Sequence, residues 1–354
     1  MRRSERDGRS GWWIFAVAFL VLNTSLVTAE TNGSWSQGGD IPHPGWAMAS
    51  CLYDGKIYAF GGGPGYAVGW TRVYDPGTDT WTLKQDMRTP RNSWNALVID
   101  GLIYLPGGWN NAHQLGDKSN GNLAVMEAYN PATDSWIELS PMPEPRWPFQ
   151  AAVVDGLIYA FGGGQQMAVY DPSLDLWTVL GDMPRPRHSF SAAEVGGLIY
   201  FMGGYDGEQV LDAVDVYDPV VNQWSERQPM AAPRWTSSTV VMDGLIYLIN
   251  GSGSVPLDPA IPLAPFDSLD RHVDVYDPVA DTWTRLVDAM EPRMGAMAVP
   301  ANGLIYYFGG LLFTDGPAWP AAMHVFDPQG RTTAIQLSSW GQIKHQIGPR
   351  SGTK

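Results

Sequence analysis

Asp100-Gly101-Leu102-Ile103-Tyr104 is one of six related segments that recur along this chain. The other five are Asp54–Tyr58, Asp155–Tyr159, Gly196–Tyr200, Asp243–Tyr247 and Asn302–Tyr306. Each segment opens with Asp-Gly, Gly-Gly or Asn-Gly between apolar stretches. This is a strong hairpin signal, because a type I′ turn needs positive φ at both central residues. The sequence therefore predicts six β-hairpins of one kind.

Further residues recur at fixed offsets from these turns. A second glycine lies seven residues after each turn glycine, at Gly62, Gly108, Gly163, Gly204, Gly251 and Gly310. A Tyr-Asp-Pro triplet or a close variant follows, ending at Pro76, Pro131, Pro172, Pro219, Pro278 and Pro328. In the first five units a tryptophan lies five residues after that proline, at Trp81, Trp136, Trp177, Trp224 and Trp283. These offsets predict four strands in each unit, which we label a to d.

One interval varies between units. From the second glycine to the Tyr or Phe of the triplet it measures 12, 21, 7, 13, 25 and 16 residues (62 to 74, 108 to 129, 163 to 170, 204 to 217, 251 to 276, 310 to 326). The step from the triplet's proline to the next turn glycine is constant, for example 76 to 101 and 278 to 303. Length variation is therefore confined to the connection between strands b and c.

The combination of Gly-Gly after an Ile-Tyr strand, Tyr-Asp-Pro and Trp resembles the Kelch repeat, over about 300 of the 354 residues. The resemblance implies an all-β fold, a six-bladed Kelch β-propeller of four-stranded blades around a channel. Units of about 40 to 60 residues with four short strands match that architecture independently. Two positions depart from the pattern: Asn250 replaces a glycine in unit five, and Thr333 stands where unit six needs its tryptophan.

The missing tryptophan predicts how the ring closes. Trp81 and its equivalents precede the proline of a Pro-Arg step by nine residues, and Trp35 precedes Pro44 by the same nine. We therefore expect the strand around Trp35 to be the outermost strand of the last blade. The propeller would then span residues 33–330.

The variable b–c connections and the d–a connections should share one face, because neighbouring strands run antiparallel. Insertions that collect on one face mark the binding side of repeat proteins. The candidate ligand-binding residues are aromatic or cationic side chains predicted at the start of the innermost strands on that face: Trp46, Arg91, Trp94, Arg146, Trp147, Arg187, His188, Arg234, Trp235 and Arg293. Strand alternation would aim the residue two positions further on in the same direction. The alternative is that the rings pack between blades and the arginines pair with carboxylates.

Evidence for catalysis in the sequence is sparse. The six histidines form no metal-spaced pair, no metal site is assigned, no catalytic residue is identified, and we expect no cofactor. Kelch relatives include copper oxidases with a Tyr–Cys crosslink and sialic-acid epimerases. No tyrosine begins a strand a beside Cys51, so an inert buried thiol is expected. Asp258, Asp267, Asp270 and Asp274 gather in or beside the longest b–c connection, where a solvated acidic loop is favoured over a Ca²⁺ site.

The two ends of the chain differ from the repeats. Residues 1–29 combine arginines, a short apolar stretch and Val27-Thr28-Ala29, a pattern typical of a secretory signal peptide; an uncleaved membrane anchor is the alternative. Residues 331–354 form a basic C-terminal tail. A net charge of -14 argues against nucleic acid as a partner.

Together these features predict a secreted or periplasmic propeller that binds a protein segment or a glycan at the face of variable loops. We expect it to be a monomer, with membrane contact only if the N-terminal segment is an anchor. The alternative function is that of a carbohydrate-active enzyme resembling the Kelch sialic-acid epimerases.

Overall fold

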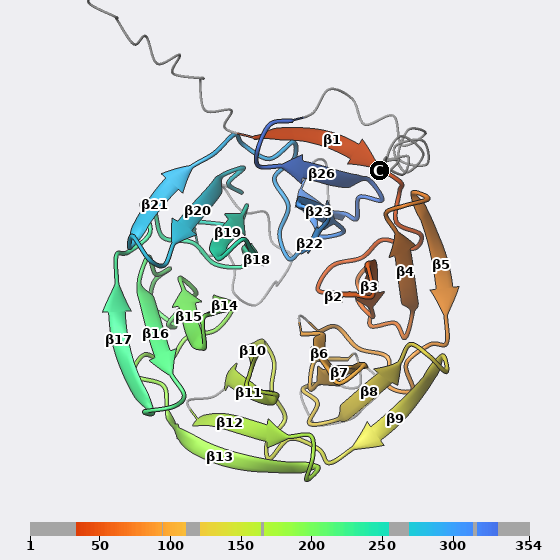
Figure 1. Ribbon diagram of the computed structural model, residues 1–354, viewed down its shortest axis with the longest axis vertical. Coiled ribbons are helices and arrows are strands. Elements are labelled where there is room, and N and C mark those ends of the chain that lie inside the picture. Colours follow the sequence, from red (N-terminus) through yellow and green to blue (C-terminus); the bar gives the residue numbers. More distant parts are fainter. Residues whose placement is uncertain are drawn as a thin grey trace, which may run out of the picture. The chain divides into compact units, whose positions relative to one another are not determined.

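In the computed structural model the chain forms a ring of six four-stranded antiparallel sheets around a central channel (Figure 1). The structure describes residues 33–93, 95–110, 121–163, 166–254, 269–313 and 317–331. The predicted signal segment and nearly all of the basic tail, including Thr333, lie outside these residues. Within them, no helix has the length and apolar character needed to span a bilayer.

Each of the first five blades is built from one continuous stretch of chain, with strand a at the channel and strand d at the outer edge. Blade 1 consists of β2 (Ala49–Tyr53), β3 (Lys56–Phe60), β4 (Thr71–Asp75) and β5 (Thr80–Lys84). Blade 2 consists of β6 (Leu97–Ile99), β7 (Leu102–Pro106), β8 (Met126–Asn130) and β9 (Ser135–Leu139). Blade 3 consists of β10 (Phe149–Val154), β11 (Leu157–Gly162), β12 (Gln166–Asp171) and β13 (Leu176–Asp182). Blade 4 consists of β14 (Ser191–Val195), β15 (Leu198–Met202), β16 (Val214–Asp218) and β17 (Gln223–Arg227). Blade 5 consists of β18 (Ser238–Met242), β19 (Leu245–Ile249), β20 (Val273–Asp277) and β21 (Thr282–Arg285).

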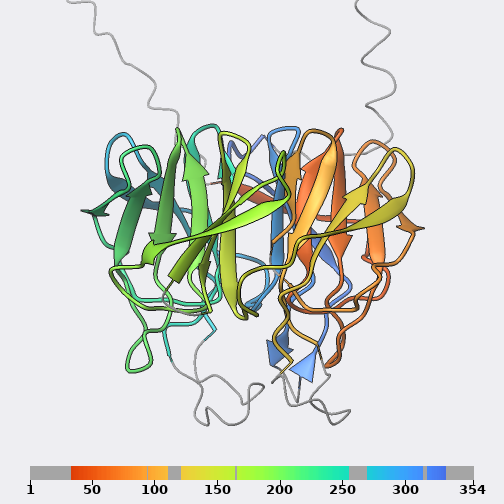
Figure 2. The same cartoon turned by 90° about the horizontal axis from the view of Figure 1, so that it is seen from below.

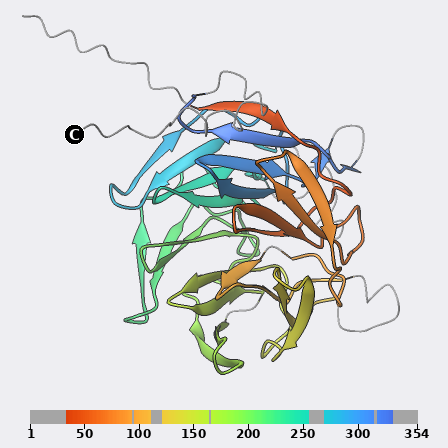
Figure 3. The ribbon, with the colours of Figure 1, turned by 45° about the vertical axis from the view of Figure 1, so that its right-hand side comes forward.

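Blade 6 joins the two ends of the repeat region, as predicted. Its strands a to c are β22 (Met297–Ala301), β23 (Leu304–Phe308) and β26 (Met323–Asp327), and its strand d is β1 (Ser34–Gly38). Trp35 lies opposite Phe326, with the ring centroids 4.8 Å apart. Figures 1 and 3 show β1 along the outer edge of β26. A short hairpin of β24 (Leu312–Phe313) and β25 (Pro317–Ala318) interrupts the b–c connection of this blade.

The six a–b hairpins have the predicted backbone geometry. Asp54 has φ 48° and Gly55 has φ 70°, and the same left-handed pair recurs in the other blades. Asn250, which replaces a glycine, also has a positive φ of 59°, and its side-chain Nδ2 donates to Tyr307 Oη at 2.9 Å.

The repeated tyrosine, tryptophan and turn aspartate form an outer belt that joins blades 1, 2, 3 and 5 each to the blade before it. In blade 3, Tyr170 donates to Asp175 Oδ1 at 2.6 Å, and the same oxygen accepts the N–H of Ser140 in blade 2 at 2.8 Å. Trp177 Nε1 then donates to the carbonyl of Ser140 at 3.0 Å. The same three bonds recur in blades 1, 2 and 5, around Trp81, Trp136 and Trp283. The invariant residues are therefore structural.

Candidate functional site

The b–c and d–a connections lie on one side of the ring, which we call the loop face (Figure 2). The hairpins between a and b and the turns between c and d lie on the other side, the turn face. Main-chain bonds tie the two kinds of connection together on the loop face: Gly62 N–H donates to Arg91 O at 3.2 Å, and Gly204 N–H to Arg234 O at 2.9 Å. The prediction that they share a face is confirmed.

The channel mouth on this face begins with one residue from each blade, which we call the rim residues: Trp46, Asn92, Trp147, His188, Trp235 and Met294. Five of them make an isolated bridge to the b–c connection of their own blade, such as His188 to Tyr205 and Trp235 to Ser252. The regular ladder of strand a begins two to five residues later, at Ala49 in blade 1 and Ser238 in blade 5. The expectation that strand a starts at the rim was wrong.

A left-handed residue follows four of the rim residues: Ala47, Ser189, Thr236 and Gly295 have φ between 52° and 61°. This conformation breaks the strand alternation that the sequence analysis assumed. After Ala47 and Ser189, the side chains of Met48 and Phe190 pack between blades and are at most 2% exposed. Trp94, the equivalent residue of blade 2, lies outside the described residues.

Aromatic rim residues pack against one another across blades 4 to 6 and blade 1. Trp235 lies 6.2 Å from His188 and 5.9 Å from Tyr205 between ring centroids, and its Nε1 donates to Ser254 O at 3.0 Å. Trp46 joins Trp235 in one apolar cluster with Met294, Leu311 and Trp319. Trp235 is 9% exposed, so part of this cluster is core.

The five predicted arginines are buried, with exposures of 0 to 5%. Arg146, Arg187 and Arg293 donate to the first carbonyl of their own Gly-Gly step, for example Arg187 to Gly203 O at 3.1 Å. Carboxylates neutralise four of them, in the pairs Arg91–Glu127, Arg187–Asp215, Arg234–Asp274 and Arg293–Glu291. This placement matches the packing alternative, because a ligand carboxylate has no access to these guanidinium groups.

Blade 1 holds a sixth buried guanidinium that the sequence analysis missed. Gly45 occupies the position of the arginine, and Arg72 on β4 reaches the same place from strand c. It donates to Gly61 O and, at 2.7 Å, to His43 O. Burial lowers the pKa of Arg72 to about 10. The sequence did contain a signal for this substitution. Two residues before the triplet tyrosine, blade 1 has Arg72, whereas blades 2, 4 and 5 have the carboxylates Glu127, Asp215 and Asp274 at the same position.

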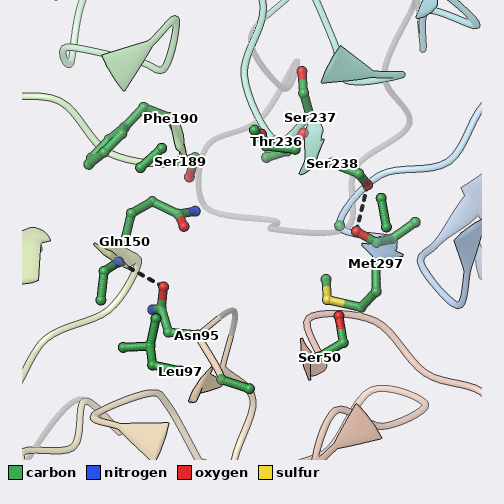
Figure 4. A pocket seen from close by; sticks show the side chains of 17 residues that line it. Ser50, Asn95, Leu97, Gln150, Ser189, Phe190, Thr236, Ser237, Ser238 and Met297 are labelled. Carbon is green, nitrogen blue, oxygen red and sulfur yellow. Dashed lines mark hydrogen bonds between the residues drawn. The ribbon is translucent and has the colours of Figure 1, made fainter. Parts of the chain in front are cut away.

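A cavity of about 170 Å³ lies in the channel just inside the mouth, lined by residues of strand a and of the segment before it from all six blades (Figure 4). Six strands converge here, so most lining residues are small. They are Ser50, Asn95, Ala96, Leu97, Gln150, Ala151, Ser189, Phe190, Ala192, Thr236, Ser237, Ser238, Thr239, Gly295, Ala296, Met297 and Ala298. None of these side chains titrates, so the cavity is polar but uncharged.

Some polar groups of this channel cavity join blades, and others are available to a ligand. Asn95 Oδ1 accepts the N–H of Ala151 at 2.8 Å, and Ser238 Oγ donates to Ala296 O at 2.6 Å. The Gln150 carboxamide extends toward the channel axis in Figure 4. Among the described residues, neither Gln150 nor Ser50 has a side-chain hydrogen bond.

A second recess, of about 350 Å³, lies on the loop face between blades 3 and 4. It contains two rim residues, Trp147 and His188, and is lined by Trp147, Pro148, Gly163, Pro186, Arg187, His188, Tyr205, Asp206 and Gly207. His188 Nδ1 lies 3.1 Å from Ser189 Oγ, and burial lowers the pKa of the imidazole. We call this recess the blade 3–4 groove.

The remaining reactive side chains are separate from one another. Burial raises the pKa of the Cys51 thiol, as expected for an inert cysteine. Asp274 is the second residue of strand β20, beside the b–c connection as expected, and it pairs with Arg234 and Arg285. Asp258 and Asp267 lie outside the described residues. Within the described ranges, no three His, Cys, Asp or Glu side chains are grouped closely enough to hold a metal ion.

Comparison with known proteins supports the repeat assignment. A family model described as the Kelch motif matches residues 47–88, 90–143 and 186–231. The chain is 30% identical over 157 residues to Kelch-like protein terF of Aspergillus terreus, covering 42% of this chain and 33% of that protein. It is 34% identical over 107 residues to Kelch-like ECH-associated protein 1B of Danio rerio, covering 30% of this chain and 18% of that protein. The chain thus spans a third or less of these curated relatives.

A solved structure titled "Structure of YjhT" has the same fold. Its TM-score is 0.66 at 17% identity, and the match covers 80% of this chain and 95% of that one. Three observations indicate the same repeat architecture: the six four-stranded blades, the matches to the Kelch motif and the likeness to this solved structure. The chain therefore belongs to the Kelch-repeat β-propeller family.

Proposed function

We propose that this propeller is an exported binding module that takes a protein segment at its loop face. The observation that carries the proposal is the polar, uncharged channel cavity, which residues from all six blades line just inside the rim residues. Kelch-repeat propellers are protein-interaction modules, and the name of the Danio rerio relative records such an association for that protein. A ligand over the mouth would contact several blades at once.

The charge distribution restricts the ligand. The chain carries a net charge of -14, and the five arginines predicted as ligand-binding are buried, four of them against carboxylates. An anionic segment or a sialic acid would approach an acidic protein whose five predicted binding arginines are buried, which is unfavourable. A neutral or basic ligand is therefore the better match.

A neutral glycan is the second candidate, and the channel cavity favours it. Hydroxyl and carboxamide groups such as Ser50 and Gln150 suit sugar hydroxyls, and neighbouring aromatic rings can stack on sugar faces. Catalysis on such a sugar would need a positioned acid and base, and the lining of the channel cavity offers no titratable side chain. This supports binding over the epimerase-like alternative.

Export is a separate part of the proposal and rests on residues 1–29. Cleavage after Ala29 would release a propeller that begins close to β1. Mass spectrometry of protein recovered from the periplasm or medium tests this. An intact N-terminus on soluble cytosolic protein would contradict export, and an intact membrane-bound product would favour the anchor.

Binding is tested by screening the purified propeller on peptide and neutral-glycan arrays, with variants on the two faces. Gln150→Ala changes the channel cavity, and Val279→Ala changes a turn-face residue that is 97% exposed. We expect the loop-face variant to lose array signals that the turn-face variant retains. Equal effects of both variants on every ligand would contradict a loop-face site.

A further inference from the structure

The blade 3–4 groove lies beside the shortest b–c connection in the sequence. Blade 3 has the shortest b–c connection, with seven residues from Gly163 to Tyr170 compared with 12 to 25 in the other blades (for example 62 to 74 and 251 to 276). The short connection leaves Trp147 and Pro148 beside the d–a connection of blade 4. A short connection at this place leaves room for an extended chain to cross between blades 3 and 4.

Rigid rings form most of the groove. Trp147, Tyr205, His188, Pro148 and Pro186 line it. Tyr205 is fixed in place: its ring packs edge-on against His188 at 5.4 Å between centroids, and its hydroxyl donates to Gly207 O at 2.8 Å. Gly163 and Gly207 add no side chains, so a bound main chain can approach closely. A groove of this kind presents flat apolar surfaces that need no rearrangement on binding.

The groove has one accessible charge, the carboxylate of Asp206. Its Oδ1 accepts the N–H groups of Gln209 at 2.8 Å and Glu208 at 2.9 Å, and these bonds lower the pKa of Asp206. Asp206 is exposed, and no described cation forms a salt bridge with it. Arg187 at the base of the groove is already neutralised by Asp215. The net negative charge of the groove therefore favours the binding of a cationic group.

We propose that the blade 3–4 groove binds a proline-rich segment that carries an arginine. Proline rings pack well between aromatic rings, and a polyproline II segment is already extended, so it loses little entropy on binding. An arginine beside the prolines would pair with the free oxygen of Asp206 and lie against Trp147 or Tyr205. This inference rests on the proposed binding function and specifies its partner.

The competing occupant is a neutral sugar ring. The recess has room for one, and its rings could stack on it. The acidic charge of the chain and the ionised Asp206 favour the basic peptide, because a neutral sugar gains nothing from either.

The test uses the full propeller and a fluorescein-labelled ten-residue peptide of prolines with two arginines, titrated by fluorescence anisotropy. We expect saturable binding that weakens with added salt. Asp206→Asn preserves the turn-capping oxygen but removes the charge, and should weaken binding about tenfold. Trp147→Leu removes one wall and should weaken it about thirtyfold.

Two matched variants control for general effects. Asp171→Asn removes an equivalent capping carboxylate of blade 3 on the turn face, and Tyr66→Ala removes an aromatic residue, 54% exposed, from the b–c connection of blade 1. Both should bind the peptide as the unmodified chain does. A peptide with glutamates for arginines, and one with serines for prolines, should bind at least tenfold more weakly.

Several results would overturn the inference. They are the absence of saturable binding, an affinity unchanged by both Asp206→Asn and Trp147→Leu, or preferential binding of a neutral oligosaccharide such as maltotriose or chitotriose at these residues. If array ligands of another chemistry still depend on Gln150, only the proline-rich inference fails. If no array ligand depends on any loop-face residue, the binding function itself fails.

Discussion

The outer belt and the channel mouth of this propeller are built by opposite rules. In the outer belt, blades 1, 2, 3 and 5 repeat the same three bonds from tyrosine, aspartate and tryptophan to the preceding blade. At the mouth, no two neighbouring blades present the same rim residue. The comparison teaches that identity between repeats marks what holds the ring together, whereas differences between repeats mark the surface available for recognition.

The largest expected effect comes from breaking the ring in its last blade. Deletion of residues 30–40 removes β1, which pairs with β26 over five residues, and the Trp35 ring that packs on Phe326. Loss of the tryptophan alone should cost about 3 to 5 kcal/mol, and the exposed edge of β26 adds to that. We expect the thermal transition to broaden or to move to a much lower temperature.

Adding a synthetic peptide of residues 31–42 should partly restore the stability of the deleted chain by refilling the vacant strand position. Differential scanning calorimetry measures both changes. A deleted chain that melts like the complete one would show that closure does not depend on β1.

The second prediction breaks the outer belt in an ordinary blade. Trp177→Ala removes a ring that lies 5.1 Å from Tyr170 and a bond to Ser140 O, which should lower the free energy of unfolding by about 3 kcal/mol. Chemical denaturation measures it. Binding, once corrected for the folded fraction, should be unchanged, because Trp177 belongs to the outer belt. A selective loss of binding would contradict the division between the two regions.

Much of the outer belt could be predicted from the sequence, and the reason is physical. The belt bonds need particular residues at fixed offsets, so the offsets themselves reveal them, and the same reasoning placed Trp35 in the last blade. The geometry of the channel mouth was harder to predict from the sequence. Ala47 and Thr236 adopt positive φ although neither is a glycine. The residue types therefore did not indicate that the alternation of side-chain directions is broken after the rim residues.

The arginines show a different limit. Arg91 and Arg234 look like rim cations in the sequence, and their partners Glu127 and Asp274 lie 36 and 40 residues later. Both carboxylates stand two residues before the triplet tyrosine or its equivalent, so a comparison of strand c between blades would have revealed the pairing. The cavity residue Gln150 had no repeat signal, because the equivalent positions carry Ala49, Asn95 and Ser191.

The third prediction concerns acid and the closing blade. His324 on β26 is 4% exposed and lies 6.3 Å from Trp35 between ring centroids. Burial and, secondarily, the charge of Arg293 lower its pKa to about 4, while Glu291 acts in the opposite direction. The unfolded chain, with a histidine pKa of about 6.5, binds this proton first. Stability should therefore fall as the pH falls from about 6.5 to 4.

His324→Gln should flatten this part of the stability profile. Melting temperatures at half-unit steps of pH measure the slopes. His188, whose pKa is also lowered by burial, and turn aspartates such as Asp175 and Asp281, whose pKa values are lowered by hydrogen bonds from tyrosines, contribute to any slope that remains in His324→Gln. Identical slopes in the unmodified chain and His324→Gln would show that the closing blade is not the acid-sensitive part.

The smallest expected effect on stability comes from the channel mouth itself. Gln150→Ala removes a carboxamide that has no hydrogen bond among the described residues and faces the channel cavity, so it leaves no polar group unpaired. The free energy of unfolding should change by less than about 0.5 kcal/mol. Asn95→Ala is the matched contrast, because Asn95 is 3% exposed and joins blades 2 and 3 through Ala151 N–H and Phe149 O. Losing that bridge leaves a buried donor and acceptor unpaired and should cost about 1 to 3 kcal/mol. If both variants lowered the free energy of unfolding equally, Gln150 would be a structural residue like those of the outer belt. The channel cavity would then offer no free carboxamide to a ligand.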